Sequence, residues 1–298
     1  MLILVTGGSG QLAKSIQSLV IKNKTNHDFI FISRSELDLA DLQSVRSYFN
    51  KNKFDLIINC AAYTKVDKAE TDQEQANLVN HLAVEKISEI AKKNNTRLIH
   101  ISTDFVFDGN QSKPYLENDS TSPLNIYGAT KLAGENAILS IMKFNAIIIR
   151  TSWVYSEYGN NFVDTILRLT KKKKELHIVS DQIGSPTFAT DLAQVILFIT
   201  TSEKLNSKNF ATEVYHYSNE GKCSWYDFTK EIVNISGLKC NIKPINTKDY
   251  PAQAERPKYV VMSKKKIIQE FDLKINFWQD SLKHCITNLS ESSTMSKE

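Results

Sequence analysis

The sequence predicts an α/β protein with a doubly wound, parallel, Rossmann-like sheet and a smaller carboxyl-terminal lobe that binds the substrate. Short apolar runs alternate with amphipathic helical patterns through the first 150 residues, and this alternation is typical of parallel sheets. The first run leads at once into a glycine turn and a helical pattern, as in folds that bind dinucleotides. Beyond residue 151 the order loosens. We therefore predict a dinucleotide-binding domain at residues 1–150, rejoined by about 188–218, and a lobe at 151–298.

The composition argues against several kinds of partner. The net charge of the 298 residues is +4 and is scattered, and 31 lysines outnumber 6 arginines, which argues against nucleic acid. The amino terminus has no charged leader and no apolar run reaches membrane length, so we expect no membrane partner. The 4 cysteines form no CxxC pair, and the 6 histidines never fall at ligand spacing. These patterns predict a cytoplasmic location and no metal site.

Residues 2–5 are the first predicted strand, and TGGSGQLA at residues 6–13 forms the turn into the first helix. In this G-x-x-G-x-x-A spacing the glycines let the backbone approach a pyrophosphate, while Ala13 keeps the helix close to the strand. A glycine-rich turn without a ligand is the alternative, and the preceding strand favours the dinucleotide. The cofactor contacts that we assign here are Gly7, Gly10, Gln11 and Leu12.

Residues 28–32 are the second strand, whose end should meet the adenosine ribose. An acidic residue there would accept both ribose hydroxyls, whereas Ser33 and Arg34 suit a 2′-phosphate. This difference predicts that NADPH is preferred, with NADH possible; a merely solvated Arg34 is the alternative. Asp38, followed by Leu39, either closes over the adenine or shapes the loop before the next helix.

Residues 54–59 are the third strand and run into a segment, Ala61, Ala62 and Tyr63, where the backbone can pass under the cofactor. Residues 71–93 are predicted as one long amphipathic helix. Asn80 in that helix is either a buried polar bridge to the active site or an exposed amide.

The helix between the fourth and fifth strands, residues 97–103 and 146–150, carries the candidate acid. Tyr127 and Lys131 are four residues apart and share one face of this helix. A positive charge beside a phenol favours the phenolate and lowers its pKa toward the working range of a proton donor. Thr103, at the end of the fourth strand, can hydrogen-bond the same substrate oxygen.

A Tyr-x-x-x-Lys pattern alone is weak. Chance gives about one match in a chain of this composition, and a second match occurs at Tyr226 and Lys230. The apolar strand that ends in Ser102 and Thr103 lies about two dozen residues before Tyr127, and nothing like it precedes Tyr226, so we place the acid at Tyr127.

Shorter patterns describe the predicted lobe. Helices are predicted at 159–169, 224–233 and 277–287, with the last two capping the substrate cleft, and a strand at 175–180. Residues 181–197 are predicted as a glycine/proline loop together with the helix into which it leads, and residues 214–218 rejoin the main sheet. From Ser290 the polar tail is predicted to be disordered.

With these motifs in place, the chain resembles the extended short-chain dehydrogenases/reductases, and most closely the dTDP-4-dehydrorhamnose reductase family. The resemblance runs nearly the whole length and is carried by blocks at 59–70, 101–109, 122–135, 150–169 and 181–193. It implies a catalytic trio of Thr103, Tyr127 and Lys131, with the last two also contacting the cofactor. It further implies a sugar pocket lined by Thr64, Val66, Asp104, Phe105, Val106 and Trp153, with Arg256 reaching the nucleotide diphosphate.

The chain departs from the family at three places. Phe105 stands where members often have tyrosine, and Ser15 and Thr190 stand where some members carry glutamates for a magnesium that bridges a dimer. We therefore expect a monomer or homodimer without bridging magnesium. The segment after Arg256 is also atypical, which leaves the choice of sugar open.

The resemblance implies an NADPH-preferring reductase of the 4-keto group of a dTDP-linked 6-deoxysugar, yielding dTDP-L-rhamnose. Tyr127 would protonate the alkoxide, Thr103 would hold the oxygen, and Lys131 would lower the pKa of the phenol. Rival readings are a reductase, epimerase or 4,6-dehydratase acting on another nucleotide sugar, and a non-catalytic regulatory subunit with the same fold.

Overall fold

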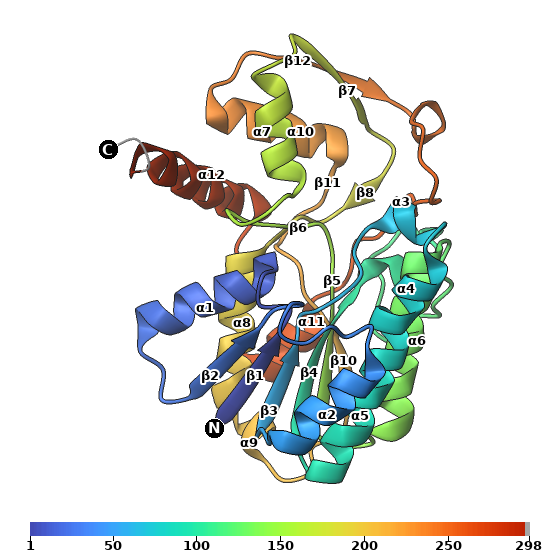
Figure 1. Ribbon diagram of the computed structural model, residues 1–298. Helices are drawn as coiled ribbons and strands as arrows, with labels where there is room; N and C mark the ends of the chain where they lie inside the picture. Colours follow the sequence, from blue (N-terminus) through green and yellow to red (C-terminus); the bar gives the residue numbers. More distant parts are fainter. Residues whose placement is uncertain (296–298) are drawn as a thin grey trace.

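The computed structural model describes residues 1–295, and its centre is a six-stranded parallel sheet (Figure 1). The strands follow the order β10-β5-β4-β3-β1-β2, and every pair among them is parallel. Their bounds are β1 Leu2–Thr6, β2 Asp28–Ile32, β3 Leu56–Asn59, β4 Arg97–Thr103, β5 Ala146–Thr151 and β10 Glu213–His216. The predicted fold class, a parallel Rossmann-like sheet, is confirmed.

Helices cover both faces of this sheet, which makes it doubly wound (Figure 1). Successive side chains of a strand point to opposite faces, so Ile3 and Val5 pack in one core cluster and Leu4 in the other. The first face carries α1 Gln11–Asn23, α8 Ala189–Thr201, α9 Glu203–Asn206 and α11 Lys265–Phe271. The second carries α2 Leu42–Lys51, α5 Ala83–Asn94 and α6 Ile126–Ile141.

The register of the strands brings their carboxyl ends to one edge. Thr6 pairs with Asn59, Asn59 pairs with His100, and Thr103 pairs with Thr151. In open α/β sheets ligands bind outside this edge. The residues that follow β1, β3 and β4 are therefore brought together.

The predicted long helix at 71–93 is present as one continuous helical stretch from Gln73 to Asn94, but it is not α-helical throughout. It divides into α4 Gln73–Asn77, a π-helical segment η1 Leu78–Leu82 and α5, and the short α3 Val66–Ala69 precedes it. Asn80 in the π segment is buried, and its amide holds the backbone N–H and C=O of Tyr63 and the hydroxyl of Thr130. These tertiary contacts, which no local pattern encodes, favour the extra residue in the turn.

The carboxyl-terminal lobe has its own core, built around Tyr155, Phe228 and Trp278. Its helices are α7 Phe162–Thr170, α10 Trp225–Ser236 and α12 Trp278–Met295. Three strand pairs complete it: β6 Val154–Tyr155 with β9 Thr187–Phe188, β7 Glu175–Val179 with β12 Asn241–Ile245, and β8 Ile183–Gly184 with β11 Cys223–Ser224. The lobe also contains one 3₁₀ turn, η3 Thr247–Asp249, and a second 3₁₀ turn, η2 Asp104–Val106, follows β4 in the main sheet.

The chain returns from this lobe to the main sheet twice. Strand β10 pairs with β5, and α11 packs Ile267 and Phe271 into a core cluster of the main sheet, although residues 265–271 were assigned to the lobe. A seven-residue amphipathic helix does not reveal its partner in the sequence, which explains this difference.

The predicted disorder from Ser290 is wrong as far as Met295, because α12 continues to that residue. Leu282, Cys285 and Ile286 anchor the preceding turns in the core of the lobe, and extending a formed helix costs little compared with starting one. Residues 296–298 lie outside the described part. No helix within residues 1–295 is both long and apolar enough to cross a membrane.

Candidate active site

A cleft of about 1060 Å³ lies along the carboxyl edge of the sheet and reaches Trp153 and Trp225 of the lobe. All but two of the predicted site residues line it. Ser33 does not, because its hydroxyl and backbone N–H both bind the Glu36 carboxylate at 2.8 Å. Val106 does not, because its side chain is fully buried in a cluster with Phe107, Tyr115 and Met262. The remaining nineteen predicted residues, from seven separate segments of the chain, therefore share one site.

The glycine turn between β1 and α1 leaves room for an anion. Gly7 has a φ of +70°, and a Cβ there would lie 2.9 Å from the backbone of Ala61. Gly10 caps α1 without a side-chain hydrogen bond, and the first turn contains no acidic residue. The helix therefore presents free N–H groups and a positive dipole end to the cleft. This cradle fits the pyrophosphate of a dinucleotide.

The adenosine end of the cleft is lined by Arg34, Leu37, Asp38 and Leu39. Arg34 pairs with Asp38 at 3.0 Å, and their side chains are 70% and 40% exposed. An exposed pair of this kind is worth about 0–1 kcal/mol, so a phosphate group can compete for the guanidinium. Arg34 is thus paired within the protein rather than merely solvated, and it remains available to a 2′-phosphate.

Thr103 and Tyr127 meet near the middle of the cleft. Thr103 lies at the end of β4, where its hydroxyl donates to Asp104 Oδ1 at 3.0 Å and accepts from the Phe105 N–H at 3.2 Å. Tyr127 lies in the first turn of α6, whose Asn125 cap accepts from Gly128 N–H. Its ring packs edge-on against Phe105, with centroids 5.7 Å apart.

The predicted lowering of the Tyr127 pKa by Lys131 is not observed. Burial raises the pKa of Tyr127 to about 12, the neighbouring Thr103 hydroxyl opposes this rise, and the Asp104 carboxylate adds to it. Lys131 instead directs its ammonium to the Ile101 carbonyl at 2.6 Å and to His100 Nε2 at 3.2 Å. Burial also lowers the pKa of Lys131 to about 8, against the opposing effect of Glu135.

Asp104 is a second unusual group in the cleft. It is 2% exposed, and its Oδ2 atom has no hydrogen-bond partner within the described residues. Burial raises its pKa to about 7, despite hydrogen bonds from Thr103 and the backbone. The sequence suggested only a sugar contact for Asp104, because burial of its carboxyl depends on the whole site.

The lobe contributes an aromatic wall. Trp153 has a φ of +48°, and its ring stacks on Trp225 with centroids 3.5 Å apart. A Cβ at Gly184 would lie 2.7 Å from the Trp153 ring, so only glycine fits there. Trp225 was missed, although it begins the helix predicted to cap the cleft. The expected second cap is wrong, since no residue of α12 lines the cleft in the described part of the chain.

Arg256 lines the cleft but is already paired. Its guanidinium binds Asp67 at 2.7 and 3.0 Å and donates to the Ala254 carbonyl at 3.1 Å, and the pair holds the pKa of Asp67 below its usual value. Two further cations in the cleft, Lys65 and Lys68, were missed. Their signal was present in the block at 59–70, which contains both lysines.

The control pair Tyr226 and Lys230 lies outside the cleft. The Lys230 ammonium sits 5.5 Å from the centroid of the Tyr226 ring, and neither residue lines the cavity. The geometry therefore distinguishes the two Tyr-x-x-x-Lys matches in the way that the sequence predicted.

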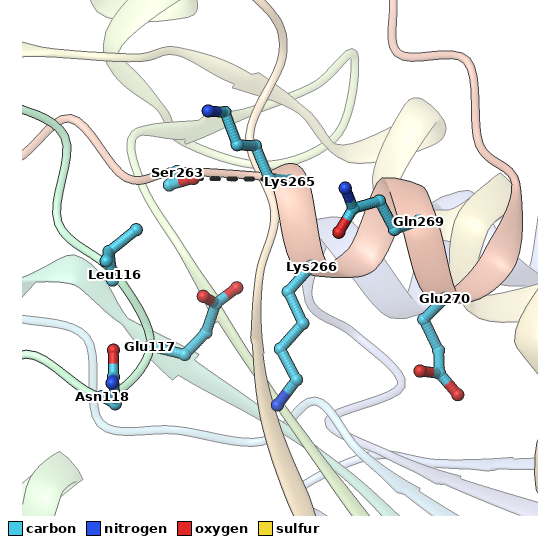
Figure 2. A pocket seen from close by; sticks show the side chains of 8 residues that line it. All are labelled: Leu116, Glu117, Asn118, Ser263, Lys265, Lys266, Gln269 and Glu270. Atoms are coloured by element: carbon cyan, nitrogen blue, oxygen red, sulfur yellow. Dashed lines mark hydrogen bonds between the residues drawn. The ribbon is translucent and has the colours of Figure 1, made fainter.

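Figure 2 shows a smaller pocket of about 380 Å³, where residues 116–118 meet α11. Glu117, Lys265, Lys266 and Glu270 are among its lining side chains, and Ser263 accepts from Lys265 N–H at 3.5 Å. None of the predicted site residues lines it, so the nucleotide ligands are assigned to the larger cleft.

Comparison with known proteins places this site in a family. The model of the family described as RmlD substrate binding domain matches residues 1–291. A dTDP-4-dehydrorhamnose reductase from Aggregatibacter actinomycetemcomitans is 39% identical over 289 residues, which cover 95% of this chain and 97% of that protein.

Two solved structures are similar along their full length. A dTDP-4-dehydrorhamnose reductase from Clostridium acetobutylicum has a TM-score of 0.90 at 36% identity, over 97% of this chain and 100% of that one. The reductase from Bacillus anthracis, solved in complex with NADP, has a TM-score of 0.88 at 35% identity, over 96% and 99% of the two chains. The resemblance seen in the sequence is thereby confirmed, and the chain belongs to the RmlD substrate-binding-domain family, that of the dTDP-4-dehydrorhamnose reductases.

Proposed function

We propose that the protein is an NADPH-dependent reductase that converts the 4-keto group of dTDP-4-dehydro-L-rhamnose to the alcohol, giving dTDP-L-rhamnose. One observation carries the proposal: Thr103, Tyr127 and Lys131 line the same cleft as the glycine turn. A hydride donor bound on that turn and a proton donor at Tyr127 can then act on one carbonyl group. Similarity to reductases of this name, one of them solved with NADP, supports the assignment.

Each residue of the trio has a distinct task. NADPH, when bound on the glycine turn, would supply the hydride for C4 of the sugar. Tyr127 donates its proton to the oxygen as negative charge develops there, and Thr103 donates a hydrogen bond to the same oxygen. The raised pKa keeps the phenol protonated at neutral pH, which is the form that a donor needs. Because an alkoxide is a stronger base than a phenolate, the transfer remains favourable.

The rest of the cleft suits a nucleotide sugar. Lys65, Lys68 and Arg256 place cationic groups where a diphosphate can bind, and the stacked pair Trp153 and Trp225 offers a flat apolar surface. At the other end, Arg34 supports a preference for NADPH over NADH. Ser33 binds Glu36 instead and does not line this end of the cleft.

The rival functions receive less support. A 4,6-dehydratase needs a further group at position 105 that moves a proton in the elimination of water, and Phe105 cannot do so. A regulatory subunit would be expected to have lost members of the trio, and all three are present. A different 4-keto nucleotide sugar remains an alternative substrate.

We also propose a cytoplasmic location and a monomer or homodimer without bridging magnesium. The four cysteines are free, as in a reducing compartment. Ser15 is buried and binds the Gln11 carbonyl at 3.1 Å, which leaves no carboxylate there for a divalent cation.

The proposal is tested by the loss of nicotinamide absorbance when the protein meets a panel of 4-keto nucleotide sugars. We expect consumption with dTDP-4-dehydro-L-rhamnose, and a kcat that falls by roughly 10²- to 10⁴-fold in Tyr127→Phe because the phenolic proton is lost. Tyr226→Phe is the matched control and should stay near wild type. Equal losses in the two variants, or formation of a 4-keto-6-deoxy product without net cofactor consumption, would contradict it.

A further inference from the structure

A chain of four buried polar side chains runs beneath the cleft. Thr6 Oγ1 lies 2.7 Å from Asn59 Oδ1, Asn59 Nδ2 lies 3.0 Å from His100 Nδ1, and His100 Nε2 lies 3.2 Å from Lys131 Nζ. All four residues are at most 1% exposed, and they come from β1, β3, β4 and α6. Four elements therefore meet in one line of hydrogen bonds that ends at the ammonium of the trio.

The protein fixes two of the three donors of the Lys131 ammonium. The Ile101 carbonyl takes one, and a His100 ring that accepts at Nε2 takes another, so one donor remains for the cleft, which Lys131 lines. The titratable groups that face it are His100 from β4, Cys60 after β3 and Glu135 on its own helix, and Tyr127 lies one turn earlier on that helix.

The neighbours of Lys131 are either paired with another residue or held neutral. Glu135 is bound by Arg150, with 2.7 Å between Oε2 and Nη2, and accepts from the Ser102 hydroxyl. The pKa of the Cys60 thiol is raised to about 12 by burial, and burial together with the Lys131 charge holds the pKa of His100 well below its usual value. The thiol and the imidazole are therefore neutral, and Lys131 is the group free to change its charge.

Two hydrogen-bond patterns satisfy this chain. If Lys131 is an ammonium, it donates to His100 Nε2, the ring donates from Nδ1 to the oxygen of Asn59, and the amide nitrogen donates to Thr6. If Lys131 is a neutral amine, every bond runs in the opposite direction, and the Asn59 amide is oriented in this second way. A neutral imidazole and a primary amide can reverse because each offers both a donor and an acceptor.

We propose that His100, backed by Asn59 and Thr6, is a positioning residue that keeps Lys131 fixed and fully hydrogen-bonded in both of its protonation states. Lys131 can then give up a proton and regain it without leaving an unpaired polar group in the core. The proposal rests on the proposed role of Lys131 in the reductase reaction.

The proton balance follows from the proposed reaction. Tyr127 loses its proton to the sugar alkoxide and is left as a phenolate, which regains a proton from the Lys131 ammonium. Lys131 becomes an amine, the bonds through His100 reverse, and one proton from solvent restores the ammonium. The cycle consumes one proton for each carbonyl group reduced and requires no further reactant.

Two substitutions of His100 distinguish a role in positioning Lys131 from a role in core packing alone. Glutamine can place its amide near Nε2 and keep the contact with Lys131, whereas asparagine reaches only the Nδ1 position and keeps the contact with Asn59. We expect His100→Gln to retain kcat within about 3-fold and His100→Asn to lose about 10-fold or more. In His100→Asn the basic limb of the pH profile should also lie about 0.5 to 1 pH unit lower, which corresponds to the free energy of one hydrogen bond. The shift is downward because the ammonium loses its acceptor. Identical basic limbs in the two variants and the wild type would overturn the proposal.

Asn59→Asp provides a second test if His100→Asn does not fold. A carboxylate accepts from His100 Nδ1–H and so fixes the tautomer whose Nε2 accepts from the ammonium. The basic limb should then move to higher pH. Movement to lower pH, or none, would overturn the proposal.

A measurement on the wild-type protein needs no substrate, so it separates a failure of this proposal from a failure of the proposed function. With ¹⁵N-labelled histidine, the spectrum of His100→Gln identifies the His100 signals. We expect a neutral ring whose proton moves from Nδ1 to Nε2 as the pH rises through the pKa of Lys131, and no such transition in Lys131→Met. A fixed tautomer, or the same transition in Lys131→Met, would overturn the proposal.

Discussion

Burial sets the protonation states of individual residues in the cleft. It raises the pKa of Tyr127 to about 12 and of Asp104 to about 7, and it lowers the pKa of Lys131 to about 8. A lysine four residues away does not offset the removal of water from the phenol, because its ammonium binds Ile101 and His100 instead. In the reductive direction this arrangement suits the chemistry, since the acid must begin the reaction protonated.

The raised pKa of Asp104 predicts an unusual dependence of stability on pH. A carboxyl whose pKa is higher in the folded state contributes stability below pH 3.8, its ordinary value, and this contribution is lost as the pH rises toward about 7. The difference corresponds to at most about 4 kcal/mol. Asp104→Asn should therefore raise the melting temperature relative to wild type at pH 8 but not at pH 4.

Asp108 provides a control of opposite sign. Hydrogen bonds from Asn110 and Tyr115 lower its pKa, so its carboxylate stabilises the fold above the ordinary pKa. Asp108→Asn should lose stability at pH 8. If both substitutions change the melting temperature in the same direction at pH 8, the buried Asp104 carboxylate does not destabilise the folded protein.

Arg34 predicts cofactor preference. Only NADPH offers a phosphate for a charge-assisted hydrogen bond, worth about 1.5–3 kcal/mol, so Arg34→Ala should raise the KM for NADPH by about 10-fold or more and leave that for NADH nearly unchanged. Steady-state kinetics with both cofactors measures this. Arg46→Ala, in α2 and outside the cleft, is the control. Equal losses for both cofactors would contradict the prediction.

Among the elements, the π segment η1 and helix α6 depend on each other. Asn80 joins Tyr63, which lines the cofactor cleft, to Thr130 in α6, between the two catalytic positions. Gly134 allows this approach, since a Cβ there would lie 2.3 Å from the Asn80 carbonyl oxygen. The contact between these elements holds the cofactor loop in register with Tyr127 and Lys131.

Gly134→Ala is predicted to have the reverse of its usual effect. In the interior of a helix this substitution normally stabilises by about 0.5–1 kcal/mol. Here the new methyl group meets backbone that cannot move freely, and overpacking of this kind costs about 1–3 kcal/mol. We expect urea unfolding to show a net loss of stability and kinetics to show a lower kcat. Asn136→Gly, on an exposed site of α6, should reduce stability alone; a stabilised and fully active Gly134→Ala would contradict the coupling.

In the whole molecule, the cleft exists because the lobe folds back onto the sheet. Arg256 binds Asp67, 189 positions earlier, and the Asn125 amide donates to the Glu255 carbonyl at 2.8 Å. Across the glycine turn, Ser156 donates to the Gln11 side chain at 2.9 Å. These contacts bring the lobe to both ends of the cleft.

At this scale we predict independence from divalent metal. Ser15 and Thr190 offer hydroxyls where a hard cation prefers carboxylates, and no group of His, Cys, Asp or Glu within residues 1–295 is arranged to hold a metal. Activity should survive dialysis against a chelator, and sedimentation should give the same mass with and without magnesium. A strict requirement for magnesium, in turnover or in dimer formation, would contradict this prediction.

Local patterns were enough to predict the parallel sheet and the first step toward its site. Strand and helix periodicity depend on neighbours within a few residues. The sequence could therefore predict the strand before Gly7, the strand that ends at Thr103 and the helix that carries Tyr127. The rule that ligands bind at the carboxyl ends of strands then placed these residues together. The resemblance to one family supplied the sugar-pocket residues, of which Val106 proved to be buried in a core cluster.

Tertiary structure alone decided the charge and direction of the side chains in this site. Lys131 meets His100 across 31 positions, Arg256 meets Asp67 across 189, and Asn80 meets Tyr63 through a π turn that helical periodicity cannot predict. Burial of Asp104 likewise requires the whole cleft. The physical reason is one of range: a hydrogen-bond partner or the loss of solvent depends on which distant segments pack together, whereas the strand and the glycine turn depend on the residues beside them in the chain.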